Sequence, residues 1–167
     1  MTVDLALQLW LQYQAAISRT LMSYEADPSL RQDLAQEAYL ALHRSAEKLS
    51  QVDNKRAYLF RIVHNVVVDH IAGSTRMVWQ PLEEQHLNEL QSDCPSVAFS
   101  SQQQNNVLLQ AVRQLALSHR QVLTLAMEDI DEKEIADILG ISYGAVRVRM
   151  NRAKMALQEI LQHATAL

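Results

Sequence analysis

The sequence DEKEIADILGISYGAVRVRMNRAK, from Asp131 to Lys154, shows the clearest helix and turn signals in the chain. Its first part spaces apolar residues along one face of a short helix: Ile135, Ala136, Ile138 and Leu139. Gly140 follows, and glycine adopts the left-handed conformation of a tight turn without steric cost. Ser142 is a good N-cap for a second helix. The stretch therefore predicts two helices joined by a short turn, a helix-turn-helix.

The second of these helices has one apolar face and one basic face. Helical spacing turns four residues inward: Val146, Met150, Ala153 and Leu157. No acidic residue occurs between Asp137 and Glu159. We therefore expect this helix to enter the major groove of DNA and to present Arg147, Asn151 and Arg152 to base edges. The alternative is a plain helical hairpin whose basic residues are solvated. The turn residues, together with a helix that carries only basic charges, favour the DNA-binding interpretation.

Composition narrows the class of protein. The chain has 167 residues, of which 49% are apolar and 20% charged, as in folded globular proteins. Only 3 Gly and 3 Pro favour an all-α fold. A single cysteine, Cys94, excludes an internal disulfide and a cysteine-cluster metal site, and we predict no metal or cofactor. The N-terminus lacks the pattern of a signal peptide and no apolar run is long enough to span a membrane, so we expect a cytoplasmic protein.

The net charge of −4 comes from one segment. Residues 77–106 contain no Lys or Arg but carry Glu83, Glu84, Glu89 and Asp93. Helical periodicity fails there, and the residues from Ser100 to Asn106 are rich in Ser, Gln and Asn. We therefore predict two small helical bundles, residues 1–76 and 107–167, joined by a flexible acidic linker, residues 77–106.

Periodicity and turn residues divide each bundle into helices. The first bundle is expected to contain helices at 4–24, 29–49 and 56–72, with Asp27 and Pro28 starting the second and Gly73-Ser74 ending the third. The second bundle is expected to contain helices at 107–117 and 118–127, the latter capped by Ser118. The helix-turn-helix follows, and its last helix extends to about Gln162.

Two separated parts of the chain resemble one protein family. DLAQEAYLALHR (Asp33–Arg44) and RAYLFRIVHNVVVDH (Arg56–His70) are similar to region 2 of bacterial RNA polymerase sigma factors of the extracytoplasmic-function type. LALSHRQVLTL (Leu115–Leu125) through RVRMNRAK is similar to region 4 of the same factors. The resemblance implies an alternative sigma factor that directs promoter-specific initiation. The amino-acid sequence of the 56–70 segment also resembles the iron-starvation branch of the family.

The resemblance implies partners and binding residues. Core RNA polymerase is the first partner, through the clamp helices of its largest subunit and its flap region; promoter DNA and an anti-sigma factor are the others. The polymerase-binding positions implied are Asp33, Gln36, Glu37 and Leu40. Those implied for the minus-10 element are Lys55, Arg56, Tyr58, Phe60, Arg61 and Asn65, with a pocket for a flipped base formed by Val52 to Lys55. Those for the minus-35 element are Ser142, Tyr143, Arg147, Val148, Arg149, Asn151, Arg152 and Lys154.

The sequence departs from the family pattern at a few positions. The third helix usually closes with adjacent arginines, whereas this one continues from His70 to Arg76 without such a pair. That leaves less phosphate-binding charge near the minus-10 element and predicts weaker or more restricted promoter melting. In region 4, Ala145 and Val148 replace residues with hydroxyl groups, and Val148 is suited to contact a thymine methyl.

Three other functions fit parts of the sequence less well. An enzyme is disfavoured because His64, Asp69 and His70 match no zinc-binding spacing and no nucleophile or phosphate-binding motif is present. A stand-alone regulator that binds operators as a dimer would explain the helix-turn-helix but leaves Asp33–Arg44 without a role. A sigma-like interaction module that has lost initiation remains open because of the missing arginine pair.

Overall fold

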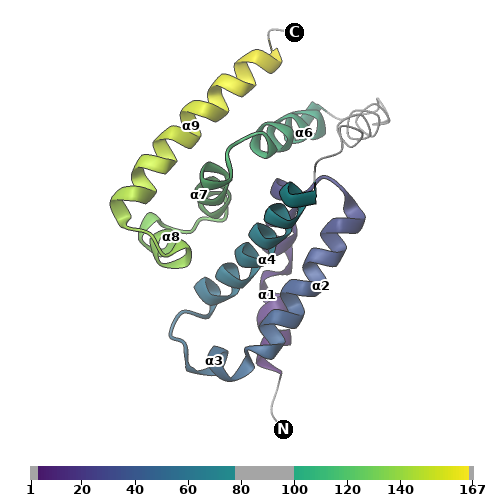
Figure 1. Cartoon of the computed structure of the whole chain (residues 1–167), viewed down its shortest axis with the longest axis vertical. Helices are drawn as coiled ribbons and strands as arrows, with labels where there is room; N and C mark the ends of the chain where they lie inside the picture. Colours follow the sequence, from purple (N-terminus) through teal and green to yellow (C-terminus); the bar gives the residue numbers. More distant parts are fainter. Residues whose placement is uncertain (1–3, 78–99, 166–167) are drawn as a thin grey trace.

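The computed structural model describes residues 4–77 and 100–165, in which every regular element is a helix (Figure 1). The all-α prediction is confirmed, as are two helical domains. The first domain contains α1 (Leu5–Tyr24), α2 (Pro28–Arg44), α3 (Ala46–Gln51) and α4 (Lys55–Met77). The second contains α6 (Ser100–Arg113), α7 (Leu117–Met127), α8 (Glu132–Leu139) and α9 (Tyr143–Thr165).

The helices of the first domain begin where capping residues satisfy free amides. An Asp4 carboxylate oxygen accepts from the Leu7 amide at 3.3 Å and begins α1. The Asp27 carboxylate accepts from the Ser29 amide at 2.9 Å, and Pro28 occupies the first turn, as predicted. The helices then bury one apolar core, whose fully enclosed members include Ile17, Leu42, Leu49, Leu59, Val63 and Val67.

Two predicted helix ends in this domain were wrong. The helix expected at 29–49 breaks at Ser45, whose amide bonds to the carbonyls of Ala41 and Leu42. The break starts the separate helix α3, which buries Leu49 in the core beside α1. The helix expected to stop at Gly73-Ser74 continues to Met77. A helical glycine costs only about 1 kcal/mol relative to alanine, which the surrounding helix tolerates.

Two predicted boundaries in the second domain also differ. Helix α6 begins at Ser100 rather than Val107, inside the stretch assigned to the linker. Gln and Asn carry small helix penalties, and neither Gly nor Pro interrupts the helix. Helix α7 begins at Leu117 because Ala116 is extended, so Ser118 lies in the first turn and is not the N-cap. The acidic residues of the predicted linker lie outside the described residues, and the domain limits stay a prediction.

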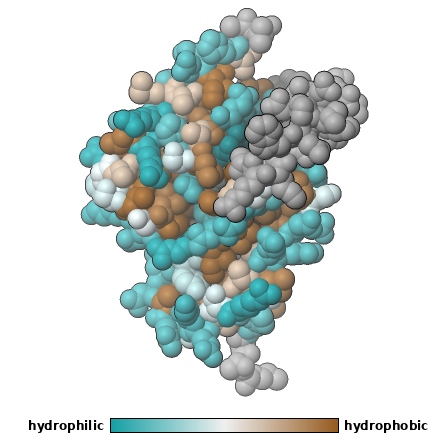
Figure 2. Space-filling model, in the orientation of Figure 1, coloured by the Kyte–Doolittle hydropathy of each residue, from teal (hydrophilic) through white to brown (hydrophobic). Residues whose placement is uncertain are grey.

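The two domains are packed together. Phe60 of α4 is buried within the core cluster of the second domain, and Leu117 of α7 packs against the core of the first. Helix α8 lies against α4, and α6 and α7 lie against α1 (Figure 1). Figure 2 shows hydrophobic residues gathered toward the middle of the visible face, with hydrophilic residues around them. Among the described helices, none is long and apolar enough to cross a membrane.

Candidate nucleic-acid interface

The helix-turn-helix forms as predicted. The Asp131 carboxylate accepts from the Glu134 amide at 2.8 Å and caps α8. Gly140 ends α8 in the left-handed conformation, at a φ of 68°, and the Ile141 amide donates back to the Ala136 carbonyl at 3.1 Å. The Ser142 hydroxyl accepts from the Ala145 amide at 3.1 Å and fixes the start of α9. Local hydrogen bonds therefore set the angle between α8 and α9.

The turn divides α9 into a buried and an exposed face. Val146, Met150 and Ala153 are buried against α7 and α8. Arg149 is half-buried, and the remaining minus-35 candidates are exposed: Ser142, Tyr143, Arg147, Val148, Asn151, Arg152 and Lys154. Figure 1 places α9 along the outside of the molecule, on the side away from α2. The exposed face is thus basic and open to a DNA groove.

Arg147 makes weak contacts within its own domain. Its guanidinium lies 3.9 Å from the Glu132 carboxylate and 5.9 Å from the centre of the Tyr143 ring. The Arg147 side chain is 68% exposed, so water screens the ion pair and it contributes little to stability. A DNA acceptor can therefore replace Glu132 at small cost.

The polymerase-binding candidates lie together on the outer face of α2. Asp33, Gln36, Glu37 and Leu40 are all exposed, and Leu40 retains 48% of its surface. The opposite face of the helix buries Leu34, Ala38 and Leu42. An apolar side chain beside carboxylates on a rigid helix is suited to a protein interface.

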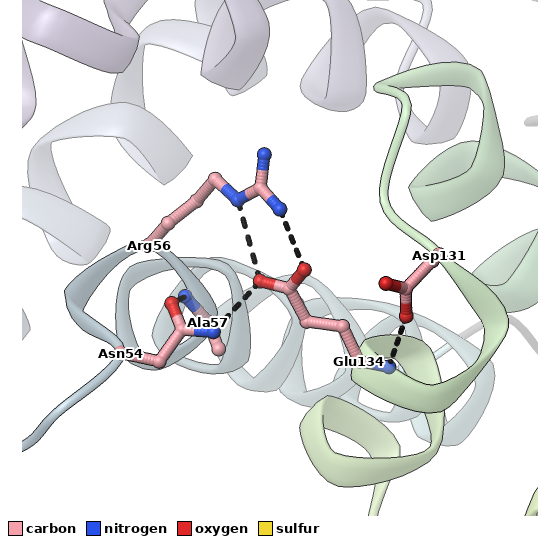
Figure 3. A network of polar contacts seen from close by, with 5 residues as sticks. All are labelled: Asn54, Arg56, Ala57, Asp131 and Glu134. Carbon is pink, nitrogen blue, oxygen red and sulfur yellow. Dashed lines mark hydrogen bonds and ion pairs between the residues drawn. The ribbon is translucent and has the colours of Figure 1, made fainter.

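Two of the three cationic candidates for the minus-10 element, Arg56 and Arg61, contact the second domain. Arg56 and Glu134 of α8 form a bidentate ion pair, with N–O distances of 3.3 and 2.5 Å (Figure 3). This contact raises the pKa of Arg56. Arg61 donates to the Ile138 carbonyl at 3.2 Å and to that of Asp137. The Lys55 ammonium donates to the Val52 carbonyl at 3.3 Å.

Phe60 does not present a stacking surface in this arrangement, and its role at the minus-10 element stays a prediction. It is 1% exposed, packed into the core of the second domain with its ring 6.2 Å from that of Tyr13. Tyr58 is half-buried against the core of the first domain. Asn65 is exposed on α4.

A cavity lies where the resemblance placed a pocket for a flipped base. It measures about 210 Å³ and is lined by Val52, Asn54, Ala57, Tyr58, Arg61, Asp137 and Ile138. The last two residues belong to α8, so the second domain forms one wall of this cavity.

Comparison with protein families identifies the two domains. Residues 9–77 match the model of Sigma-70 region 2, and residues 105–157 match that of Sigma-70, region 4. The chain belongs to the sigma-70 family. Both region 2 and region 4 match, so this sigma factor is not a stand-alone helix-turn-helix regulator. It is an alternative RNA polymerase sigma factor, a class of non-enzymatic initiation factors. Membership of the iron-starvation branch stays a prediction.

Individual relatives agree with this assignment. The sigma-H factor of Pseudomonas aeruginosa is 27% identical over 165 residues, which cover 92% of this chain and 84% of that protein. SigZ of Bacillus subtilis is 21% identical over 155 residues, which cover 92% and 85%. RpoE of Bartonella quintana, solved with the anti-sigma factor NepR, shares the fold at a TM-score of 0.72 and 19% identity, covering 96% and 98%. CnrH, solved with the cytosolic domain of CnrY, gives 0.66 and 21%, covering 95% and 88%.

The residues that join the two domains of this sigma factor do not stand out in its sequence. Glu134 contacts Arg56 across 78 positions, and the Tyr24 hydroxyl lies 3.1 Å from His64 and 3.3 Å from the Thr124 hydroxyl of α7. Neither set carries a local motif. The nearest signal is the recurrence of Asp131, Glu134 and Asp137 at every third residue, from the N-cap of α8 into the helix, which gives that end of the domain an acidic side.

Proposed function

We propose that the exposed basic face of α9 reads the minus-35 element, that the start of α4 contacts the minus-10 element, and that the outer face of α2 binds core polymerase. The observation that carries the proposal is the capped helix-turn-helix with a buried Val146 and exposed Arg147 and Arg152. A rigid helix with guanidinium groups on its open face suits bidentate contacts with guanine.

Binding by the free protein is expected to be weak. Residues 107–167 carry as many acidic as basic side chains, so only the local charge of α9 attracts phosphate. Promoter affinity therefore depends on polymerase, which holds both domains on the DNA at once. We therefore expect this sigma factor to act in the cytoplasm, where it is bound to the polymerase.

Run-off transcription with purified core polymerase on fragmented genomic DNA tests the proposal. Wild type is expected to initiate from a defined set of promoters. Arg152→Ala should relax the choice of minus-35 sequence and weaken the best sites by about 1–3 kcal/mol. Gln158→Ala is the matched control, because Gln158 is exposed on the same helix α9 but lies beyond the residues proposed for the groove. An unchanged promoter profile in Arg152→Ala would contradict the assignment of α9 to the groove of the minus-35 element.

An anti-sigma factor is part of the same proposal. One structure of similar fold is the sigma factor RpoE in complex with the anti-sigma factor NepR, and another is CnrH in complex with the cytosolic domain of CnrY. We expect a comparable partner for this sigma factor. Co-purification of the chain from its own cells, with mass spectrometry of bound proteins, tests for it; recovery of core polymerase alone would contradict it.

A further inference from the structure

Arginines from both domains gather at the C-terminal end of α1. Arg31, near the start of α2, donates to the carbonyls of Glu25 and Ala26 at 3.1 and 2.9 Å. Arg113, the last residue of α6, donates through its Nε to the Met22 carbonyl at 2.9 Å. These carbonyls lie within one turn of each other along α1. A guanidinium group of the first domain and one of the second therefore lie close together.

A third arginine lies behind these two. Arg120 of α7 donates to the carbonyls of Arg113 and Leu115 at 2.6 and 3.0 Å. Its guanidinium lies over the Tyr24 ring, 5.5 Å from the centre. Its Nε atom is buried and has no hydrogen-bond partner among the described residues. Arg120 therefore acts on this place mainly through its charge.

Negative charge is scarce around the three arginines. Glu25 is the carboxylate that acts on Arg113, but one of its oxygens lies 3.1 Å from His70 Nε2 and the other accepts a backbone amide. Burial lowers the pKa of Arg113, and the neighbouring cations Arg31 and Arg120 lower it further. Helix-end carbonyls carry only partial charges. In the packed arrangement of the two domains, the closed form, positive charge is therefore in excess at their border.

The two outer arginines retain donors for a ligand. An arginine side chain has five N–H donors. The bond from Arg113 to the protein uses its Nε, and the bonds from Arg31 use one terminal nitrogen. Both side chains are half-buried rather than enclosed. Two neighbouring guanidinium groups with free N–H pairs are suited to bidentate contacts with phosphate oxygens.

An open cavity borders this arginine cluster. It measures about 600 Å³ and is lined in part by Met22, Leu109 and Thr124. Leu109 lies one turn before Arg113 on α6, and Thr124 lies one turn after Arg120 on α7. The volume falls within the usual range of small-molecule sites, roughly 300–1,000 Å³. The cavity therefore has room for a group that is attached to a phosphate held by the cluster.

We propose that Arg31 and Arg113, with Arg120 behind them, form a binding site for a small polyphosphate anion. Two adjacent guanidinium groups match a diphosphate or triphosphate, whose charges are similarly close together. Because Arg31 belongs to the first domain and Arg113 to the second, the bound anion bridges the domains and stabilises the closed form. The site does not depend on the proposed contacts with promoter DNA.

Isothermal titration calorimetry of the full chain with sodium tripolyphosphate, without magnesium and at constant ionic strength, tests the site. Wild type should bind one anion per chain in a saturable manner. Arg113→Gln and Arg31→Gln should each weaken binding by about tenfold or more, because each removes charged hydrogen-bond donors. Arg31→Gln decides the matter if Arg113→Gln loosens the contact between the domains, since Arg31 bonds only within its own domain.

Two variants with the same change of charge serve as controls. Arg44→Gln lies at the exposed end of α2, and Arg152→Gln lies on the basic face of α9. Both should keep the wild-type affinity for tripolyphosphate. The anion should also raise the melting temperature of wild type and of both controls, but not that of Arg31→Gln.

Adenosine triphosphate, again without magnesium, distinguishes two sources of the same chemistry. Affinity equal to that of tripolyphosphate would show that the phosphates alone are recognised. Tighter binding of the nucleotide would show that the cavity receives the nucleoside. Either result supports the site.

Three results overturn the inference. They are no saturable binding by wild type, wild-type affinity in Arg31→Gln, and an equal loss of affinity in Arg152→Gln and Arg31→Gln. The last would mean that the anion binds to basic surface in general. Failure of the proposed function is separate, because it appears as wild type that initiates no transcription with core polymerase, whatever the affinity for polyphosphate.

Discussion

His64 is a buried polar residue of the first domain that is linked through Tyr24 to Thr124 of the second domain. It is 2% exposed, and its Nδ1 lies 3.1 Å from the Tyr24 hydroxyl, which lies 3.3 Å from the Thr124 hydroxyl. Thr124 donates its proton to the Arg120 carbonyl at 2.8 Å, so it accepts from Tyr24, and Tyr24 accepts from His64 Nδ1–H. The His64 Nε2 atom is buried without a partner as an unprotonated acceptor.

This environment predicts a loss of stability in mild acid. Burial lowers the pKa of His64 to about 4, from an ordinary value of 6.5. Tyr24, whose pKa burial raises, stays neutral beside it, and Arg120 lies over the Tyr24 ring, so no anion favours protonation. Below pH 6.5 the unfolded chain binds a proton that the native chain does not. Unfolding free energy should fall by about 2 kcal/mol between pH 7 and pH 5.

Urea unfolding at several pH values measures this loss. His64→Gln is the control, because it keeps a polar side chain but removes the titrating group. Its stability should be lower at pH 7 and should vary less with pH, since the other histidines titrate equally in both proteins. Parallel pH profiles for the two proteins would assign the acid sensitivity to another group.

Within the helices and their ends, replacing two glycines with alanine is expected to change the free energy of unfolding in opposite directions. Gly140 has a φ of 68° and a Cβ there would touch nothing, so Gly140→Ala costs only backbone strain, roughly 1–2 kcal/mol. Gly73 lies inside α4 with nothing within 4 Å of a Cβ, so Gly73→Ala should stabilise by about 0.5–1 kcal/mol. Thermal unfolding of both variants checks the signs. Equal shifts would mean that the turn conformation carries no strain.

Local signals decided which elements were predicted well. Gly140 and Ser142 act on amides and dihedral angles within four residues, so the helix-turn-helix followed from sequence, as did Asp27 and Pro28 at the start of α2. The break at Ser45 was not predicted because its cause is distant: burial of Leu49 against α1. The prediction begins helix α6 too late because the polar composition of its first turns resembles that of a linker.

The candidate site divides in the same way. The open face of α9 follows from helical periodicity, and exposed Asn151 and Arg152 agree with it. The contacts of the minus-10 candidates do not follow from periodicity. Long-range packing brings Arg56 to Glu134 and places Phe60 in the core of the other domain. Periodicity assigns a residue to a face of its helix, but it does not say which domain covers that face.

At the scale of the whole molecule, one aromatic side chain joins the two cores. Phe60 extends from the first domain into the core cluster of the second, whereas its neighbour Leu59 is buried in the core of its own domain. Removing a buried Phe side chain costs about 3–5 kcal/mol, and removing a buried Leu side chain costs about 2–5 kcal/mol. The two losses are similar in size but act on different contacts.

Phe60→Ala should therefore uncouple the domains, whereas Leu59→Ala should weaken one of them. Wild type is expected to unfold in one calorimetric transition, because the closed form links both cores. Phe60→Ala should split this into two transitions, with the first domain retaining its packing around Leu59. Leu59→Ala should lower the melting temperature of the first domain and, because the domains remain joined, that of the whole. Identical profiles for the two variants would show that Phe60 is an ordinary core residue and that the domains fold as one unit without it.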